Sequence, residues 1–200
     1  DVSDQGLGPG EVTVVAAAIS TYAVLASLTL SGNKITGTKY EGGGNWSYDV
    51  DLSGFTSLCQ VLGKLNEVNL SDCGLGPASM PELAKVFRDA DAGIVSVNRL
   101  ANHFGDEGLA TLLTAIEGTS VRSLCGLTEG QTTADFSGQN LSPIDCKILA
   151  AEYDFCGFIA AVESIDLSGC KLTGATEEWN GTTGEYVCQK IDSDMDGFIA

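Results

Sequence analysis

The chain has 200 residues, of which 44% are hydrophobic, so it can bury a continuous core and is not expected to be disordered. Its 27 acidic and 10 basic residues give a formal net charge of −17. This field repels phosphate backbones, which argues against nucleic-acid binding, and it favours a protein partner with a basic surface. No apolar run approaches the roughly 18–20 residues that a membrane span requires, so no transmembrane segment is expected.

Along the chain, the hydrophobic pattern predicts strands and helices in alternation. Apolar residues at i, i+3 and i+4 indicate helices, and short segments with alternating apolar residues indicate strands. A capping box at Ser79 and Glu82 and a Ser142–Pro143 pair predict two helix starts. The segment 120–130 does not fit a helix. The expected strands lie at 28–30, 68–70, 97–99, 134–136 and 165–167, and the expected helices at 12–22, from 53, from 79, at 108–116 and from 143.

A long internal period underlies this alternation. Leu7-Gly8-Pro9, Leu75-Gly76-Pro77 and Leu141-Ser142-Pro143 follow one another at intervals of 68 and 66 residues. A second set of anchors, Ile35, Phe104 and Leu172, is spaced by 69 and 68 residues. Each super-period near 68 residues therefore contains two smaller repeats, giving about six repeats in 1–200.

The six anchors align on the pattern L-x-x-L-x-L-x-x-N/C-x-L. The slot two residues before each anchor holds Asn33, Cys73, Asn102 and Cys170 in four repeats. An asparagine amide can satisfy the backbone groups of a turn, and a cysteine fits the same small slot. We therefore expect Cys73 and Cys170 to be structural thiols. Arg99 departs from the pattern because it occupies an inward strand position, where a structural ion pair or a local register shift is expected.

This pattern resembles the ribonuclease-inhibitor-like class of leucine-rich repeats, including arrays found in dinoflagellate algae. The resemblance implies an α/β leucine-rich-repeat solenoid, or horseshoe, with a parallel β-sheet on its concave face and helices on its convex face. It covers a single domain, 1–200. A solenoid needs polar caps at its ends, and none is recognisable, so the chain is interpreted as a window on a longer array.

Two insertions interrupt the register at 38–49 and 175–191. Each is rich in glycine and polar residues and carries one tryptophan with tyrosine nearby, and both are expected on the same rim. Loops on a rigid scaffold often carry recognition residues, although these aromatic residues would equally serve to pin each loop to the solenoid edge. The candidate partner-binding residues here are Trp46, Tyr48, Trp179 and Tyr186.

The predicted concave face is polar and mildly acidic. Its candidate partner-binding residues are Glu67, Asn69, Asp72 and Asp166, which suit a polar or basic surface. This face offers no aromatic hot spot.

The segment from Asp192 to Ile199 matches the first eight positions of an EF-hand calcium loop. Its repeat equivalent, Asp49 to Thr56, has the same spacing but places Gln60 at position twelve, where a calcium loop needs a glutamate. A loop-to-helix junction with acidic residues near a helix N-terminus therefore explains the motif better, and no metal site is assigned.

No catalytic constellation is recognisable. The single histidine, His103, is expected on an exposed turn and has no aligned nucleophile or second ligand. The seven cysteines form no disulfide-like or zinc-like spacing, which favours a reducing, intracellular compartment. We expect a non-enzyme without a cofactor, acting as a protein-binding or scaffolding module. The alternatives are a permanent accessory subunit of a large assembly, such as a plastid or membrane-associated one in an alga, and a calcium-responsive repeat protein.

Overall fold

The computed structural model describes residues 1–22, 25–89, 92–155, 157–173, 176–180 and 185–189, the last two ranges by their backbone alone. The chain is an α/β protein in which parallel strands alternate with helices, which confirms this part of the predicted fold class. It divides into two compact units, Asp1–Glu129 and Gly130–Ala200. The division falls between the second and third super-periods of the sequence.

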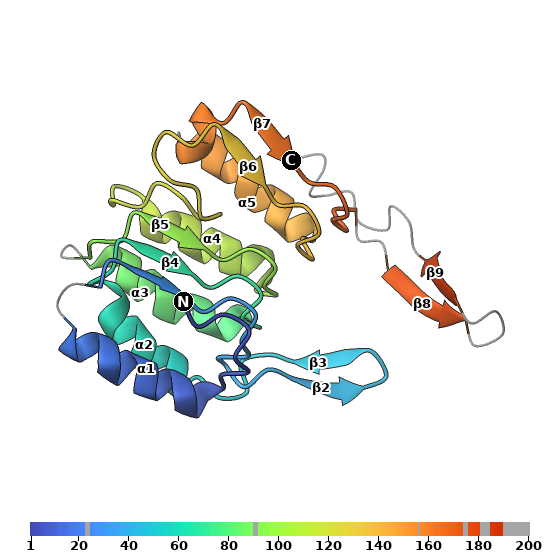
Figure 1. Cartoon of the computed structure of the whole chain (residues 1–200), viewed down its shortest axis with the longest axis horizontal. Coiled ribbons are helices and arrows are strands. Elements are labelled where there is room, and N and C mark those ends of the chain that lie inside the picture. The colour runs from blue at the N-terminus through green and yellow to red at the C-terminus, as the bar shows by residue number, and fades with distance from the viewer. Residues whose placement is uncertain (23–24, 90–91, 156, 174–175, 181–184, 190–200) are drawn as a thin grey trace. The chain divides into compact units, whose positions relative to one another are not determined.

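The first unit combines a parallel sheet with helices and a hairpin, and Figure 1 shows its sheet strands and helices in two layers. Its strands are β1 (Ser27–Thr29), β2 (Lys39–Gly42), β3 (Asn45–Ser47), β4 (Glu67–Asn69) and β5 (Ser96–Asn98). Its helices are α1 (Pro9–Thr21), α2 (Ser53–Leu62), the 3₁₀ helix η1 (Pro77–Ser79), α3 (Met80–Arg88) and α4 (Gly105–Ile116). Within the described ranges of the chain, no helix combines the length and apolar character needed to cross a membrane.

The sheet of this unit has the order β1-β4-β5, with all strands parallel. Leu28, Val68 and Val97 face one another in register and are all buried. The ladder continues beyond the strands, because the backbone N–H of Val2 donates to Thr29 and that of Leu30 donates to Asn69. Successive repeats therefore stack in parallel at the positions that the sequence period predicted.

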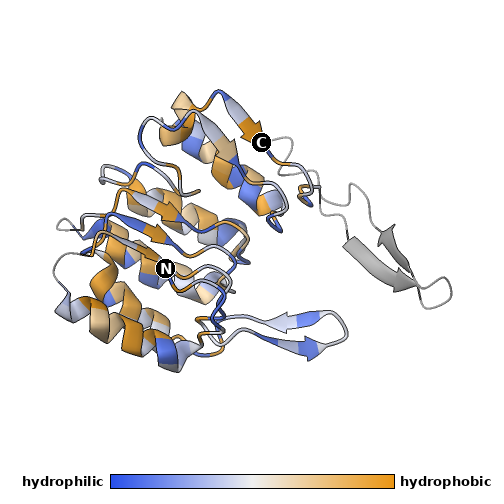
Figure 2. Cartoon of the chain, in the orientation of Figure 1, coloured by the Kyte–Doolittle hydropathy of each residue, from blue (hydrophilic) through white to orange (hydrophobic). Residues whose placement is uncertain are grey.

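The core of the first unit lies between the sheet and the helices. Full burial of one leucine side chain contributes about 2 kcal/mol to folding, so the repeated apolar positions supply much of the stability. Figure 2 shows hydrophobic residues on the strands and helices, and a pale to blue ribbon over β2 and β3. Side chains buried completely between the layers include Val12, Leu30, Ile35, Phe55, Leu58, Leu62, Leu65, Leu70, Leu75 and Leu83. Leu25, by contrast, is 39% exposed.

Arg99 is fully buried, as its inward strand position predicted. Its guanidinium carbon lies 4.8 Å from the centre of the Phe104 ring, so a cation–π contact forms part of its environment.

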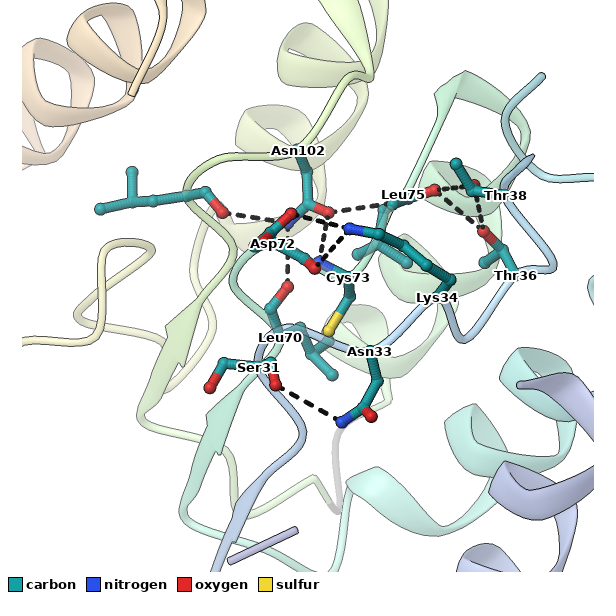
Figure 3. A network of polar contacts seen from close by, with 12 residues as sticks. Ser31, Asn33, Lys34, Thr36, Thr38, Leu70, Asp72, Cys73, Leu75 and Asn102 are labelled. Atoms are coloured by element: carbon teal, nitrogen blue, oxygen red, sulfur yellow. Dashed lines mark hydrogen bonds and ion pairs between the residues drawn. The ribbon is translucent and has the colours of Figure 1, made fainter. Parts of the chain in front are cut away.

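A ladder of asparagine and cysteine side chains joins consecutive repeats (Figure 3). The Asn33 Oδ1 accepts hydrogen bonds from the backbone of Gln5 and Leu7, and its Nδ2 donates to Val2 and Leu30. Asn102 makes the same contacts two repeats further along the chain. The predicted role of the N/C slot is therefore confirmed: the side chain satisfies the backbone of its own turn and of the preceding one.

The cysteine side chains in this slot make fewer of these hydrogen bonds than the asparagine side chains do. Cys73 is buried, and its Sγ donates to the Leu30 carbonyl at 3.2 Å. Cys170 Sγ donates to the equivalent carbonyl of Phe136 at 3.2 Å, although this residue is only partly buried. Both are structural thiols, as expected.

The residue three positions before every anchor adopts a left-handed backbone conformation. At Asp4, Gly32, Asp72 and Gly138 the N–H of this residue donates to the backbone of the next repeat, for example from Asp4 to Ser31. This conformation favours glycine, and three of the six repeats have it. The six residues with their φ angles are Asp4 (54°), Gly32 (74°), Asp72 (48°), Ala101 (57°), Gly138 (65°) and Gly169 (75°).

The second unit repeats the strand–helix alternation. Strands β6 and β7 pair in parallel, with Ala134 opposite Ile165, so the weakest sequence copy still forms a strand. The helix α5 begins at Pro143 with Ser142 as its N-cap, as predicted. The elements are β6 (Thr133–Asp135), α5 (Pro143–Asp154), the 3₁₀ helix η2 (Phe158–Ala161), β7 (Ser164–Asp166), β8 (Thr176–Asn180) and β9 (Glu185–Gln189).

The capping box predicted at Ser79 is wrong. Ser79 precedes α3, but its side chain caps no N–H of that helix. Instead its hydroxyl donates to the Gly76 carbonyl at 2.7 Å, which closes the short η1 turn. The segment 120–130 forms no helix, in agreement with the sequence.

Candidate binding surfaces

The solvent-facing side of the β1-β4-β5 sheet is the first candidate surface. Ser27, Glu67 and Ser96 are in register, and so are Thr29, Asn69 and Asn98. These side chains line a shallow depression of about 150 Å³, together with Gly126. The surface offers hydroxyl, amide and carboxylate groups, so it can form hydrogen bonds to a polar partner.

Two predicted site residues on strand ends have a local structural role. Asn69 Oδ1 accepts hydrogen bonds from the Ser71 N–H at 3.0 Å and from the Ser71 hydroxyl at 2.8 Å. Asp166 Oδ1 accepts from the Ser168 N–H at 2.9 Å in the same way. Each side chain therefore shapes the turn that follows its strand.

This turn contact recurs along the chain and was missed at the sequence level. Its signal in the sequence is an aspartate or asparagine at the last strand position of a repeat, with a serine two residues later. It occurs at Asp1–Ser3, Asn69–Ser71, Asp135–Ser137 and Asp166–Ser168. Asn98 makes the equivalent contact with the N–H of Leu100 at 3.1 Å.

Of the other two predicted residues on this side, one has a side chain that makes no hydrogen bond or ion pair with the described residues. Glu67 is exposed on β4 and has no ion pair within the described part of the chain. Asp72 instead lies in the left-handed turn beyond the strand, where it forms an ion pair with Lys34 at 2.9 Å. Glu67 is thus the better candidate for a basic partner group.

The first insertion forms an antiparallel hairpin of β2 and β3, which is the second candidate surface. Tyr40 pairs with Trp46 across the strands, with ring centres 5.3 Å apart. The Tyr40 residue is 56% exposed and Trp46 is 49% exposed. The Tyr40 hydroxyl also accepts a hydrogen bond from the Gly44 N–H in the turn, at 2.9 Å. The aromatic pair therefore stabilises the hairpin and still presents much of its surface to solvent.

The N-terminal end of the β2–β3 hairpin is attached to the next repeat. The hydroxyls of Thr36 and Thr38 both donate to the Gly74 carbonyl, at 2.9 and 2.6 Å, and both threonines are buried (Figure 3). The Asp51 N–H donates to the Thr36 carbonyl, which closes the base of the hairpin.

The C-terminal end of this hairpin is attached through Asp49. Its two carboxylate oxygens accept hydrogen bonds from the N–H groups of Gly76 and Ser79, each at 2.9 Å. Asp49 therefore satisfies the N-terminus of the η1–α3 segment in the following repeat. A Cβ on Gly76 would lie 2.7 Å from the Tyr48 Cβ, so only glycine permits this close approach.

Tyr48, a predicted binding residue, stacks on His103. The ring centres are 4.5 Å apart and the planes differ by 18°. Burial raises the pKa of Tyr48 above its usual value. This residue therefore attaches the hairpin base to the turn before α4, and the exposed recognition surface of the hairpin is carried by Tyr40 and Trp46. Tyr40 was not among the predicted site residues, although its place opposite Trp46 in a short glycine-rich segment was a usable signal.

The second insertion contains the antiparallel pair β8 and β9. Trp179 lies opposite Tyr186 in the register of the two strands. Each insertion thus forms a hairpin with one tryptophan directly across from one tyrosine, in reversed order.

The proposed calcium-loop segment, Asp192 to Gly197, lies outside the described residues. Its repeat equivalent is committed to other contacts, because Asp49 accepts from the next repeat and Asp51 accepts from the Ser53 N–H at 2.9 Å. Hydrogen bonds from Ser53 lower the pKa of Asp51. A Cβ on Gly54 would overlap the Pro9 carbonyl, so this glycine allows α1 and α2 to approach each other. Among the described residues, no cluster of three or more histidine, cysteine, aspartate or glutamate side chains is arranged to hold a metal ion.

A groove of about 480 Å³ lies between α2 and α3. Its lining is chemically mixed, with the Glu82–Lys85 ion pair at 2.6 Å beside the Cys59 thiol. Burial raises the pKa of Cys59 to about 12, so this thiol is protonated at neutral pH and is a poor nucleophile.

The fold and these surfaces define an α/β chain of strand–helix repeats, with a hairpin attached by its base in the first unit. Comparison with protein-family models and with curated proteins gives no match.

Proposed function

We propose that the chain is a stretch of leucine-rich-repeat solenoid that serves as a non-catalytic protein-binding or scaffolding module. The support for a solenoid is the recurrence of one set of contacts: the parallel ladder, the asparagine or cysteine slot, and the left-handed turn residue. In this proposal the strands of all six repeats line a concave face and the helices cover the convex face.

The observation that carries the binding function is the attached hairpin of β2 and β3. Its base is held by buried hydrogen bonds from Thr36 and Thr38 and by the carboxylate of Asp49. Its tip presents the half-exposed rings of Tyr40 and Trp46. A rigid base with exposed aromatic rings is the arrangement of a preorganised binding element, because little conformational entropy is lost when a partner binds.

The polar strand face would supply a second part of the same interface. Glu67 and the neighbouring Ser27, Thr29 and Asn98 offer acidic and hydrogen-bonding groups. With a net charge of −17, the chain attracts a partner with a basic surface.

The test is affinity purification with the full chain from an extract of its source, followed by quantitative mass spectrometry. Wild type is compared with Trp46→Ala, Glu67→Lys and the convex-face control Gln60→Ala. A protein retained by wild type and by Gln60→Ala, but lost from either of the other variants, would support the proposal. Identical protein profiles for all four baits would overturn it.

A permanent accessory subunit is the second candidate function. The observation that favours it is an apolar pocket of about 360 Å³ in the second unit, beside the exposed Tyr153 and Ile165. Native size-exclusion chromatography of the source extract distinguishes the two. A permanent subunit elutes only with its assembly, whereas a module that binds reversibly also elutes as a small species.

A further inference from the structure

The apolar pocket of the second unit is less well covered than the corresponding place in the first unit. It has a volume of about 360 Å³ and is lined by side chains of α5, η2, β7 and the turn that follows β7. Two of these side chains are strongly exposed, Tyr153 to 65% and Ile165 to 43%. A contiguous exposed apolar surface of this kind marks a place where another segment packs.

The first unit shows how this wall is covered when the repeat is complete. Through the alignment of the repeats, five of the pocket residues have counterparts in α1 and the repeat of β1 that are all buried, whereas the pocket residues are half-buried or exposed. The pairs, with the pocket residue first, are Cys146 and Val12, Tyr153 and Ile19, Ile165 and Leu28, Leu167 and Leu30, and Leu172 and Ile35.

The helix α2 packs against this wall in the first unit. It lies beside α1, the helix that corresponds to α5 (Figure 1). Phe55 and Leu58 of α2 are completely buried. The two helices approach closely at Gly54, where an added Cβ would overlap the Pro9 carbonyl oxygen. A phenylalanine preceded by glycine is therefore what the first unit places against the start of its α1 helix.

The sequence repeats both partners of this close approach. Pro143 is the first residue of α5, as Pro9 is the first residue of α1. The dipeptide Gly197-Phe198 follows the second hairpin as Gly54-Phe55 follows the first. Gly197 and Phe198 lie outside the described residues, and they belong to the same unit of the chain as the pocket.

We propose that the apolar pocket of the second unit is the docking site of the chain's own segment around Phe198, with the phenylalanine ring against the apolar wall and Gly197 beside the Pro143 carbonyl. An apolar ring suits a lining of aliphatic side chains because its burial needs no polar partner. This inference is independent of the proposed binding function. It gives the pocket an occupant other than the partner chain of the second candidate function, and the two cannot fill the pocket together.

The first experiment uses the Cys146 thiol as a reporter, because it lines the pocket and is only half-buried. The full chain is treated with iodoacetamide, and mass spectrometry of its peptides gives the alkylation rate of each cysteine. The variants are Phe198→Ala, which removes the ring, and Gly197→Val, which blocks the close approach. Asp196→Ala is the matched control, since the corresponding residue of the first unit, Ser53, is exposed.

We expect Phe198→Ala and Gly197→Val each to raise the alkylation rate of Cys146 at least about fivefold, because the docked segment no longer shields the thiol. Asp196→Ala should leave the rate within about twofold of wild type. The fully buried Cys73 of the first unit should react no faster in any variant, which shows that the chain is still folded. An unchanged Cys146 rate in both variants, or an equal rise in the control, would overturn the inference.

A second measurement decides the matter if a substitution unfolds the chain. Phe198 is replaced by the photoreactive analogue benzoylphenylalanine in the otherwise unchanged full chain, which is irradiated at low concentration. A cross-link within one chain to 143–155 or to 164–173 supports the inference. A covalent dimer would assign the pocket to a second copy of the chain, and a cross-link elsewhere or none at all would place residue 198 outside it. Each of these outcomes contradicts the inference and leaves the affinity-purification test of the binding function unaffected.

Discussion

At the scale of single residues, the side chains that recur in the repeats act on the backbone. Asn102 illustrates this, since its amide makes five hydrogen bonds to main-chain groups of two repeats. Asn69 and Asp166 do the same more locally, at the turns after their strands. A polar residue at a fixed repeat position is therefore weak evidence for a binding site, because the repeated backbone geometry explains it.

Asn102→Ala is expected to lower the free energy of unfolding by at least about 3 kcal/mol, because it leaves several buried backbone groups without partners. Asn140→Ala is the matched control. This asparagine is exposed and makes no side-chain hydrogen bond with the described residues, so its loss should change stability by less than about 0.5 kcal/mol. Urea unfolding followed by circular dichroism measures both. Similar values for the two variants would contradict the role given to the ladder.

The Cys73 thiol gives a prediction about pH. Burial is the main cause that raises its pKa from 9.0 to about 12. The unfolded chain ionises this thiol near its ordinary pKa while the folded chain keeps it protonated, so the stability associated with it is complete below pH 9.0 and is lost as the pH rises towards 12. The free energy of unfolding of wild type should therefore decline more steeply above pH 9.0 than that of Cys73→Ala. Parallel pH profiles would count against this assignment.

At the scale of elements, the hairpin of β2 and β3 depends on the repeat that follows it. Asp49 has a φ of 54° and accepts two backbone hydrogen bonds at the start of the η1–α3 segment. A single side chain thus connects the insertion to the next helix. The hairpin and the helix should lose stability together when this connection is removed.

Asp49→Ala is expected to lower the free energy of unfolding by about 1–2 kcal/mol, from the lost cap and from a left-handed backbone that alanine tolerates poorly. Asp49→Gly separates the two causes, because glycine adopts this backbone freely but cannot accept a hydrogen bond. Asp49→Asn keeps an acceptor and the tolerated backbone, so it should be the mildest change. The prediction is contradicted if alanine and asparagine have equal effects in urea unfolding.

At the scale of the whole molecule, the segments Asp49 to Thr56 and Asp192 to Ile199 hold equivalent positions in the repeats, and this equivalence argues against the calcium hypothesis. The first copy of the acidic motif is used to cap a helix and to shape a turn. We therefore expect Asp192 and Asp194 to serve the fold and not a metal ion.

Calorimetric titration of calcium chloride into the full chain should give no saturable heat. The thermal unfolding midpoint should likewise be unchanged by millimolar calcium, because a ligand that does not bind the folded state cannot stabilise it. Asp194→Asn is the control variant. Saturable binding that this substitution abolishes would restore the hypothesis of a calcium-responsive protein.

The sequence alone determined the repeat register, the positions of the parallel strands and most helices, and the structural role of Asn33, Cys73 and Asn102. These features follow from apolar spacing and from one small polar slot, which are local properties repeated many times. Periodic repetition makes such a pattern recognisable. A copy that matches the consensus poorly, such as the strand around Ala134, can be located from the spacing of the other copies.

Only the tertiary structure decided which insertion residues anchor the hairpin and which remain exposed. The contacts of Asp49 with Gly76 and of Tyr48 with His103 join residues that are 27 or more positions apart, and no local pattern specifies them. The turn contacts of Asn69 and Asp166 are different, because each has a local signal, a serine two residues later. A side chain's availability to a partner depends on what its neighbours in space already take from it, and that is a property of the folded chain.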